Sequence, residues 1–211
     1  MRVDPSGIPF ILIAAAPAVL LAVVGRPAWA AGLVVLPIVM ALFFRDPNRT
    51  PPSGPALVVA PADGRVMFAG LGRTGETPAG EWLQVTIFLS VFDVHINRAP
   101  AGGRVTQLDF VPGRFLPAFR HDSYQNEHSE IWLDDAGTTI VTRQVVGLLA
   151  RRVVCRLRLG DSVGRGERIG LMKFGSRMDV FMPVTAIVTV TAGERVRAGE
   201  TVIGRLSEGA G

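Results

Sequence analysis

One short pattern occurs twice in the C-terminal part of the chain, as GDSVGRGERIG at Gly160–Gly170 and as GERVRAGETVIG at Gly193–Gly204. Both copies read G-[DE]-x-V-x-x-G-E and then end in an apolar residue followed by glycine. Glycine adopts the positive φ angles that tight connections between β-strands require. The repeat therefore predicts a β domain whose strands are joined by turns of this kind.

The residues around the repeat extend the β pattern over most of the chain. From Ala56 onward, short runs rich in Val, Ile, Thr or Phe alternate with Gly, Pro and Asp, which is typical of strands separated by turns. The turns, and the segment Pro61–Val66, are similar to those of lipoyl- and biotinyl-type domains. We therefore expect a mainly β fold, a barrel-sandwich of this type. The expected strands are 57–60, 64–69, 82–89, 103–110, 129–134, 138–146, 153–158, 169–174, 180–182 and 186–191, with a short helix at 147–152.

The N-terminal segment has a different composition. Two apolar runs, Ile8–Val24 and Ala28–Phe44, flank the turn signal Gly25-Arg26-Pro27. Each run has about the minimum length of a membrane-spanning helix. The pattern predicts a membrane-anchoring hairpin over residues 1–44, which either crosses the bilayer twice or dips into one leaflet.

Two other interpretations of this segment are weaker. In one, Ile8–Val24 is the apolar part of a secretory signal peptide and Ala28-Trp29-Ala30 is its cleavage site, but cleavage there would leave a second apolar run. In the other, both runs are core helices of a soluble domain, but neither run has a polar face. Residues 45–55 (RDPNRTPPSGP) are dense in Pro, Asn and Gly, and they predict a linker to a catalytic domain at 56–211.

The distribution of positively charged residues predicts on which side of the membrane the catalytic domain lies. Arg2 precedes the hairpin and Arg45 and Arg49 follow it, so the positive-inside rule predicts a catalytic domain on the cytoplasmic side of the cell (inner) membrane, although Arg26 lies in the turn. The net charge of +4 favours anionic partners. Zinc-finger spacing and basic helices, which mark nucleic-acid-binding modules, do not occur in the sequence. We therefore expect an anionic membrane surface as a partner, and no nucleic acid. A single cysteine, Cys155, leaves no disulfide framework.

The chemically most informative stretch is RIGLMKFGSRMDV at Arg168–Val180. Its Gly175-Ser176 dipeptide alone would indicate only a turn. Together with its surroundings, the stretch resembles the phosphatidylserine decarboxylase family, in particular the short bacterial and archaeal form, and the resemblance covers nearly the whole chain. The matching motifs, besides the apolar anchor, are Phe44–Pro47, Pro61–Val66, Phe92–Pro100 (FDVHINRAP), Asn126-Glu127, Ala150–Cys155 and Phe174–Arg177.

The resemblance implies a proenzyme that cleaves itself between Gly175 and Ser176. The products would be a long chain, residues 1–175, and a short chain, residues 176–211, which form a heterodimer. The Ser176 hydroxyl would attack the Gly175 carbonyl, and elimination and hydrolysis would convert Ser176 into a pyruvoyl group. This covalent cofactor would form a Schiff base with the amine of phosphatidylserine and accept electrons as CO2 leaves, which gives phosphatidylethanolamine.

The resemblance also implies catalytic roles for His95 and Asp63. His95 lies in the FDVHINRAP motif, where it would act as a proton donor or base. Longer members of the family carry a second histidine three residues further on, where this chain has Arg98. In those members that histidine works with an aspartate, matched here by Asp63, in self-cleavage. Two alternatives therefore stay open: His95 does both jobs, or Asp63 activates Ser176 through water.

Other polar residues near these motifs have less specific roles. Lys173, Arg177 and Arg98 are candidate substrate-binding residues, because a developing carboxylate needs cations or hydrogen-bond donors nearby. Solvated charges at strand ends would explain Lys173 and Arg177 equally well. His121 and His128 lie in a polar stretch, and we expect them at the surface or near the headgroup. The spacing of Cys, His, Asp and Glu predicts no metal site.

A carrier or binding module is the second interpretation. Lys173 follows a G-D-x-V-x-x-G-E turn at roughly the spacing of a lipoyl-lysine, and Met172-Lys173 is similar to the biotin-attachment motif. However, Phe174 replaces the second methionine of that motif, and the sequence contains no Asp-Lys-Ala. For the decarboxylase, the sequence leaves open whether the lipid has a diacylglycerol or an archaeal backbone.

Overall fold

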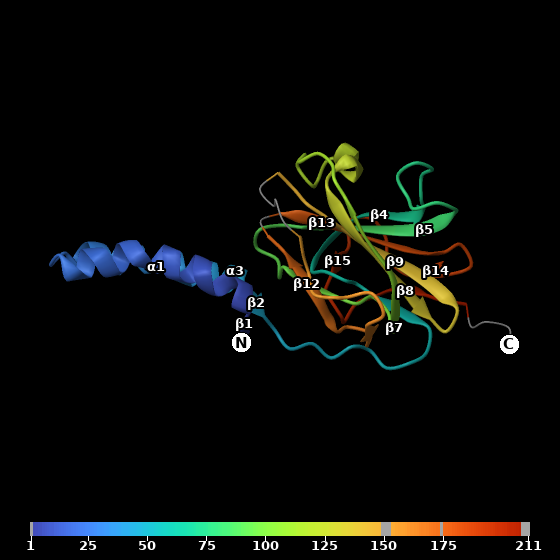
Figure 1. Cartoon of the computed structure of the whole chain (residues 1–211), viewed down its shortest axis with the longest axis horizontal. Coiled ribbons are helices and arrows are strands. Elements are labelled where there is room, and N and C mark those ends of the chain that lie inside the picture. The colour runs from blue at the N-terminus through green and yellow to red at the C-terminus, as the bar shows by residue number, and fades with distance from the viewer. Residues whose placement is uncertain (1, 149–152, 174, 208–211) are drawn as a thin grey trace. The chain divides into compact units, whose positions relative to one another are not determined.

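The computed structural model describes residues 2–148, 153–173 and 175–207. The chain forms two compact units, Met1–Asn48 and Arg49–Gly211 (Figure 1). Of the short helix expected at 147–152, residues 147 and 148 are not helical and residues 149–152 lie outside the described part of the chain.

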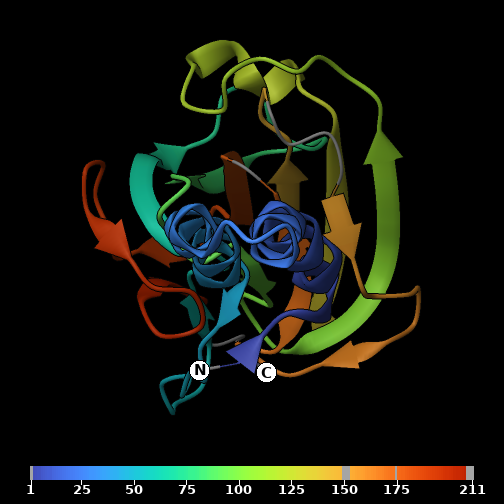
Figure 2. The same ribbon diagram turned by 90° about the vertical axis from the view of Figure 1, so that its left-hand side faces the viewer.

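The first unit is an apolar helical hairpin. Helix α1 (Ile8–Val23) follows the 3-10 turn η1 (Pro5–Gly7) and packs against α2 (Pro27–Leu33) and α3 (Val35–Phe43), and Figure 2 shows the two arms end-on. Strand β1 (Arg2–Val3) pairs with β2 (Arg45–Asp46) and joins the two ends of the unit. The segment Pro5–Val23 is long and apolar enough to cross a membrane, whereas Pro27–Phe43 is shorter.

The second apolar run forms two helices rather than the single helix we expected. The break falls at Val34, between α2 and α3. Pro37 lies four residues after Leu33, and it has no N–H to donate to the Leu33 carbonyl. The missing hydrogen bond favours a break at this point.

The second unit is built on an antiparallel eight-stranded sheet with the order β11-β7-β8-β9-β13-β5-β4-β15. The sheet curls around the apolar core, as Figure 2 shows. Its strands are β4 (Gly64–Leu71), β5 (Trp82–Leu89), β7 (Gly103–Val111), β8 (His128–Asp135), β9 (Thr138–Val145), β11 (Ser162–Val163), β13 (Ser176–Pro183) and β15 (Arg195–Val196). The 3-10 helix η2 (His121–Gln125) lies in the long connection between β7 and β8.

Two three-stranded sheets complete the unit. One has the order β10-β12-β6 and the other has the order β14-β16-β3. Their strands are β3 (Leu57–Val59), β6 (Ile96–Arg98), β10 (Val153–Cys155), β12 (Arg168–Met172), β14 (Ile187–Val188) and β16 (Val202–Arg205). The prediction of a mainly β, barrel-like domain that follows N-terminal apolar helices in the sequence is therefore confirmed.

The sequence repeat has a clear structural counterpart. The first copy forms β11 and β12, and the second copy forms β15 and β16. Strands β11 and β15 pair with opposite edges of the eight-stranded sheet. The corner glycines Gly166 and Gly199 have φ angles of 78° and 74°, as the repeat predicts, and they lie against each other.

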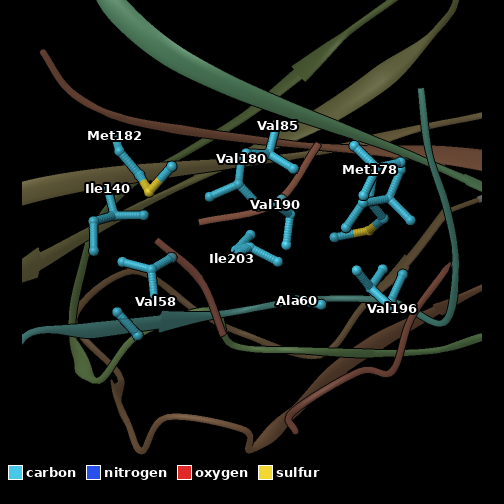
Figure 3. Close-up of a cluster of buried hydrophobic side chains, with 14 of the residues drawn as sticks. Val58, Ala60, Val85, Ile140, Met178, Val180, Met182, Val190, Val196 and Ile203 are labelled. Carbon is cyan, nitrogen blue, oxygen red and sulfur yellow. The ribbon is translucent and has the colours of Figure 1, made fainter. Parts of the chain in front are cut away.

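The largest apolar cluster lies inside the curled sheet. Met178, Val180 and Met182 of β13 are fully buried there, next to Val85 and Ile87 of β5. Figure 3 shows Val85 and the three β13 side chains above others from the small sheet that contains β3 and β16, among them Val58 and Ile203. The core therefore fixes β13, the strand that begins at Ser176, on one face.

Candidate active site

The sheet topology gathers the sequence motifs at one end of the eight-stranded sheet. Ser176, the first residue of β13, pairs with Leu89 at the end of β5. Its neighbour on β13 pairs with Val145 at the end of β9, and Val145 also pairs with His128 at the start of β8. Asp63 directly precedes β4, which runs antiparallel to β5. In an antiparallel sheet, these starts and ends lie on the same side, so residues far apart in sequence share one edge of the domain.

Ser176 lies on the inner face of β13. Successive residues of a strand point to opposite faces, so Ser176 faces the same way as Met178, in the core. The serine is completely buried, and its Oγ atom has no hydrogen-bond partner among the described residues. Leaving a buried hydroxyl unsatisfied costs about 1–3 kcal/mol. A cost of this kind calls for a functional explanation.

Gly175, directly before Ser176, has a φ of 72°. This value lies in the left-handed region, which residues with a side chain rarely adopt. A Cβ built on Gly175 would meet nothing within 4 Å. Backbone conformation, rather than crowding, therefore accounts for glycine at this position.

His95 is fully buried in the connection between β5 and β6. Its Nδ1 atom lies 2.9 Å from the Asp93 carbonyl oxygen, and a carbonyl oxygen can only accept. Nδ1 therefore carries a proton, so that in the neutral form of the ring Nε2 is the basic nitrogen. The Met172 N–H donates to the His95 carbonyl over 3.3 Å, so His95 lies beside the end of β12, close in sequence to Gly175.

Asp63 is engaged by groups other than Ser176. Its carboxylate accepts hydrogen bonds from Arg49 Nη2 at 2.9 Å and from the Ala198 N–H at 2.7 Å. Burial raises the pKa of Asp63, and this effect outweighs the Ala198 N–H and the Arg49 charge, which both lower it. No hydrogen bond joins Asp63 to Ser176 in the part of the chain that the structure describes.

Arg98 also makes its described contacts away from Ser176. It is 4% exposed, and its Nη1 donates to the Gly166 carbonyl over 2.8 Å. A Cβ on Gly199 would come within 2.9 Å of the Arg98 side chain. Arg98 therefore fastens the two corners of the sequence repeat. Lys173, by contrast, lies in the connection between β12 and β13 and is half-buried.

Arg177 points to the outer face of the sheet, opposite to Ser176. Its Nε donates to Asp179 over 2.8 Å and its Nη1 donates to Ser123 over 3.1 Å. Asp179 also accepts from Thr86 Oγ1 at 2.7 Å. This buried network borders a cavity of about 310 Å³, which is lined by Met67, Phe68, Arg73, Glu76, Gln84, Thr86, Phe119, His121 and Arg177.

The two remaining histidines differ from each other. His121 is exposed at the rim of that outer cavity, as expected. The expectation that His128 lies at the surface is wrong, because it is only 7% exposed and its Nδ1 lies 2.7 Å from the Asn126 carbonyl oxygen. Burial lowers the pKa of His128.

Sequence reasoning missed several residues at this end of the sheet. Gly147 follows β9 and lies against the Gly175 carbonyl. The buried amides of Asn97 and Gln144 are joined by a hydrogen bond of 2.8 Å on the inner face. Asn126 stood within a quoted motif but without a role. A glycine after a β-branched run reads as an ordinary strand end, so nothing local in the sequence marks Gly147.

Comparisons with known proteins identify the family to which the chain belongs. A model of the family "Phosphatidylserine decarboxylase" matches residues 36–204. Three similar curated proteins are each named phosphatidylserine decarboxylase proenzyme. That of Symbiobacterium thermophilum is 47% identical over 184 residues, covering 85% of this chain and 86% of the relative. Those of Geotalea uraniireducens and Solibacter usitatus are each 41% identical, over 202 residues (95% of this chain and 94% of the relative) and 206 residues (97% of both). This chain therefore belongs to the phosphatidylserine decarboxylase family.

Proposed function

We propose that this chain is a phosphatidylserine decarboxylase proenzyme, which cleaves itself at Gly175–Ser176 and then converts phosphatidylserine to phosphatidylethanolamine and CO2. The observation that carries the proposal is the buried Ser176 hydroxyl at the head of a central strand, preceded by a glycine with a positive φ. Its location in a chain of this family gives the unsatisfied hydroxyl a purpose.

Self-cleavage and formation of the pyruvoyl group consume no reactant other than the chain itself and water. The Ser176 Oγ forms a bond to the Gly175 carbonyl carbon, the Gly175–Ser176 C–N bond breaks, and the hydroxyl proton ends on the released amine. A base then removes the Cα proton of residue 176 as the Gly175 carboxylate leaves from its Cβ, and a double bond remains between the Cα and Cβ of residue 176. Water then replaces the nitrogen of residue 176, which leaves as ammonia. Residue 176 thereby becomes a pyruvoyl group.

Strand pairing and apolar burial would hold the two products together as a heterodimer. The short chain, residues 176–211, would begin with β13, which pairs with β5 along its whole length and with β9 along most of it. Met178, Val180 and Met182 of this strand are fully buried in the core. Separation of the chains would expose this apolar surface, so burial opposes it.

The base that activates Ser176 is the point that the sequence left open. We assign this role to His95, because its Nδ1 proton is bound to the Asp93 carbonyl and Nε2 is then the basic atom. Asp63 is the weaker candidate, since Arg49 and the Ala198 N–H already bind its carboxylate. Asp63 would then hold the linker residue Arg49 against the second copy of the repeat. After cleavage, His95 remains in place to hold or deliver a proton.

The covalent pyruvoyl group supplies a ketone that binds the substrate amine and accepts the electron pair released with CO2. The chain's own part is to bind and orient the lipid headgroup. Lys173 is the cation that we propose for the anionic groups of the substrate, because it lies in the connection that contains the cleaved bond. Arg98 and Arg177, the other candidates, make buried contacts elsewhere.

Exposed apolar side chains support a membrane surface as the partner of this end of the domain. The connections that follow β5, β7 and β9 all leave the sheet at the Ser176 end. These connections carry Val91, Phe92, Phe115, Phe119 and Leu148, each at least 38% exposed. Apolar groups gathered in this way mark membrane or protein contacts. With the helical hairpin of residues 1–44 as the anchor, the enzyme would meet its substrate at the headgroup level, on the cytoplasmic side of the cell membrane.

The test of the proposed function is the covalent state of the purified full chain. Intact mass measurement is expected to show residues 1–175 and a short chain from 176 that begins with a blocked, ketone-bearing residue. The Ser176→Ala variant is expected to remain uncut and to form no phosphatidylethanolamine from phosphatidylserine vesicles. Formation of that product by Ser176→Ala would overturn the proposal. A single chain with lipoate on Lys173 would identify a carrier instead.

A His95→Gln variant separates the two assignments of the base. If His95 serves both steps, the variant stays uncut as well as inactive. Cleavage at the wild-type rate, together with lost decarboxylation, would shift the activation of Ser176 to Asp63. Asp63→Asn is then the variant that remains uncut.

A further inference from the structure

We propose that Gly147 is a positioning residue for self-cleavage: its Cα forms the surface that holds the Gly175 carbonyl in place, and Asn126 fixes that surface. The inference rests on the proposed self-cleavage at Ser176 and adds the groups that aim the attacked carbonyl. It follows from contacts of the residues after β9 with the residues just before β13.

The first observation is the proximity of Gly147 to the bond that is cleaved. Val145, at the end of β9, pairs with Arg177, so the chain two residues later passes Gly175. A Cβ built on Gly147 would collide with the Gly175 carbonyl oxygen, closer than any real Cβ approaches such an atom. The same Cβ would lie 3.2 Å from the Gly175 carbonyl carbon and 3.4 Å from Ala118 Cβ. The attacked carbonyl and Ala118 therefore both border the space beside Gly147.

The reason for glycine at 147 is this contact and not backbone conformation. Gly175 has a positive φ, but Gly147 is not among the glycines with positive φ. An alanine at 147 would thus introduce no backbone strain. Its methyl group would occupy the space of the Gly175 carbonyl oxygen, so that either this carbonyl or the chain at 147 has to move.

The second observation is a set of hydrogen bonds from Asn126 that fixes the residue before Gly147. The Asn126 side chain is completely buried, and its Nδ2 donates over 2.8 Å both to the Val146 carbonyl and to the Leu116 carbonyl. Its Oδ1 accepts from the Leu116 N–H at 2.9 Å. The residue directly before Gly147 is thereby tied to the long connection between β7 and β8.

The same connection is also tied to the strand that follows the cleaved bond. Ser123 Oγ donates to the Ala118 carbonyl over 3.1 Å and accepts from Arg177 Nη1 at 3.1 Å. Ala118 borders the same space beside Gly147 as the Gly175 carbonyl. The connection between β7 and β8 therefore binds the chain next to Gly147, which contacts Gly175, and also binds Arg177, the residue after Ser176.

This arrangement matters because the attack by Ser176 is sensitive to geometry. The Ser176 Oγ atom must reach the carbonyl carbon of Gly175, the preceding residue. A misplacement of about 1 Å can lower the rate about 100-fold. Among the described residues beyond its chain neighbours, a Cβ on Gly175 would meet no atom within 4 Å, so side-chain crowding does not hold this residue in place. The contact with Gly147 acts on the Gly175 carbonyl itself, which is the group that Ser176 attacks.

The experiment follows the conversion of newly made full chain into its two products by pulse-chase labelling and denaturing gels. We expect Gly147→Ala to slow cleavage about 100-fold, as expected for a carbonyl displaced by about 1 Å. The matched control is Gly102→Ala, because a Cβ there would meet its nearest atom, the Val163 carbonyl oxygen, at 3.6 Å and the backbone φ is not positive. Gly102→Ala is expected to cleave at the wild-type rate.

A second readout distinguishes positioning from a general loss of structure. Once the bond is cut, the Gly175 carbonyl has become a free carboxylate and its position no longer limits the reaction. Decarboxylase activity per cleaved Gly147→Ala molecule is therefore expected to equal that of the wild type. A merely structural role would lower the activity per cleaved molecule as well as the cleavage rate.

A second variant keeps the proposal testable should Gly147→Ala fail to fold. Asn126→Asp retains the acceptor for the Leu116 N–H but loses both donations from Nδ2, and it is expected to slow cleavage while leaving the space at 147 unchanged. Cleavage of Gly147→Ala, or of folded Asn126→Asp, at the wild-type rate would overturn the inference. The proposed function would stand in that case. An uncut wild-type chain would instead overturn the proposed function itself.

Discussion

The two faces of β13 are built in opposite ways. On the inner face, Ser176 is followed by Met178, Val180 and Met182, and the only polar group has no partner among the described residues. On the outer face, Arg177 and Asp179 pair with each other and with Ser123 and Thr86 from other parts of the chain. One strand therefore carries a buried hydroxyl without a described partner on one face, and on the other a polar network that leaves only one carboxylate oxygen, Asp179 Oδ2, without a described partner.

In the proposed enzyme, the inner face of β13 would carry the reacting hydroxyl and the outer face would support the strand. Apolar packing on the inner face surrounds Ser176 without occupying its hydroxyl. The outer network fixes the position of β13 and of the connection between β7 and β8. It does so through buried charged groups, which would destabilise the protein if they had no partner. Variants that affect one face only can measure this division. They are best made in the Ser176→Ala background, so that every chain remains uncut.

The largest effect on stability is expected from Asp179→Ala on the outer face. The change leaves the Arg177 charge buried, with a side chain only 5% exposed, and without its carboxylate partner. We expect the free energy of unfolding to fall by about 3–5 kcal/mol, which is typical when one partner of a buried ion pair is removed. Denaturant unfolding of the full chain in detergent, followed by the fluorescence of Trp82 and Trp132, measures the change.

The double variant Arg177→Met/Asp179→Ala is the control for this prediction. Removing both charges is expected to restore much of the lost stability, because no uncompensated charge remains. Simple addition of the two single effects would show that the outer face is not the coupled network described above.

Thr86→Val is expected to have an intermediate effect. Valine keeps the shape of threonine but removes the donor to Asp179 and the acceptor of Gln84 Nε2, whose hydrogen bonds are 2.7 Å and 2.9 Å long. Unsatisfied buried groups of this kind cost about 1–3 kcal/mol. The same unfolding measurement applies, and a change indistinguishable from zero would count against the outer network as a source of stability.

Ile87→Val tests the inner face at the neighbouring position of the same strand. Ile87 is fully buried and pairs with Met178, whereas Thr86 pairs with Asp179. Removal of one methylene is expected to cost about 0.5–1.5 kcal/mol. A larger loss than that of Thr86→Val would reverse the proposed order of the two faces.

The smallest effect is a change in pH dependence at His128, further along the outer face. Burial lowers the pKa of this histidine, so the unfolded chain takes up a proton below pH 6.5 that the folded chain resists. Stability should therefore fall as the pH drops from 6.5 through the lowered pKa. Because glutamine does not titrate, His128→Gln should flatten this part of the curve and leave the curve above it parallel to that of the unaltered chain. If the stability of His128→Gln still falls with pH below 6.5 as in the unaltered chain, other groups cause this pH dependence. Glu130 and Arg143 are the nearest charged side chains.

Local sequence was sufficient where one physical signal dominated. The strand at Trp82–Leu89 was predicted with its observed bounds, because a β-branched and apolar run is bounded there by turn residues. The apolar N-terminal helices followed from composition alone. The Gly-rich repeat predicted the corners at Gly166 and Gly199, because glycine readily adopts the positive φ angles that such corners require.

The sequence failed where a residue depends on partners far along the chain. Strand β13 was expected only at 180–182, because Arg177 and Asp179 look like turn or surface residues, whereas it begins at Ser176. Their burial depends on Ser123 and Thr86, which are 54 and 93 residues away. His128 looked exposed for the same reason. The role of Ser176 was predicted only through the family motif, and the contact between Gly147 and Gly175 requires the folded sheet.

The placement of the two repeat copies also has a consequence for solubility. The edges of an open sheet can recruit strands from other molecules, which leads to aggregation, and very short edge strands are one protection against it. Both edges of the large sheet here end in two-residue strands, β11 and β15, and each is supplied by one copy of the repeat. A protein gathered on a membrane meets its own copies at high local density. The duplicated motif would thus keep neighbouring molecules from joining edge to edge.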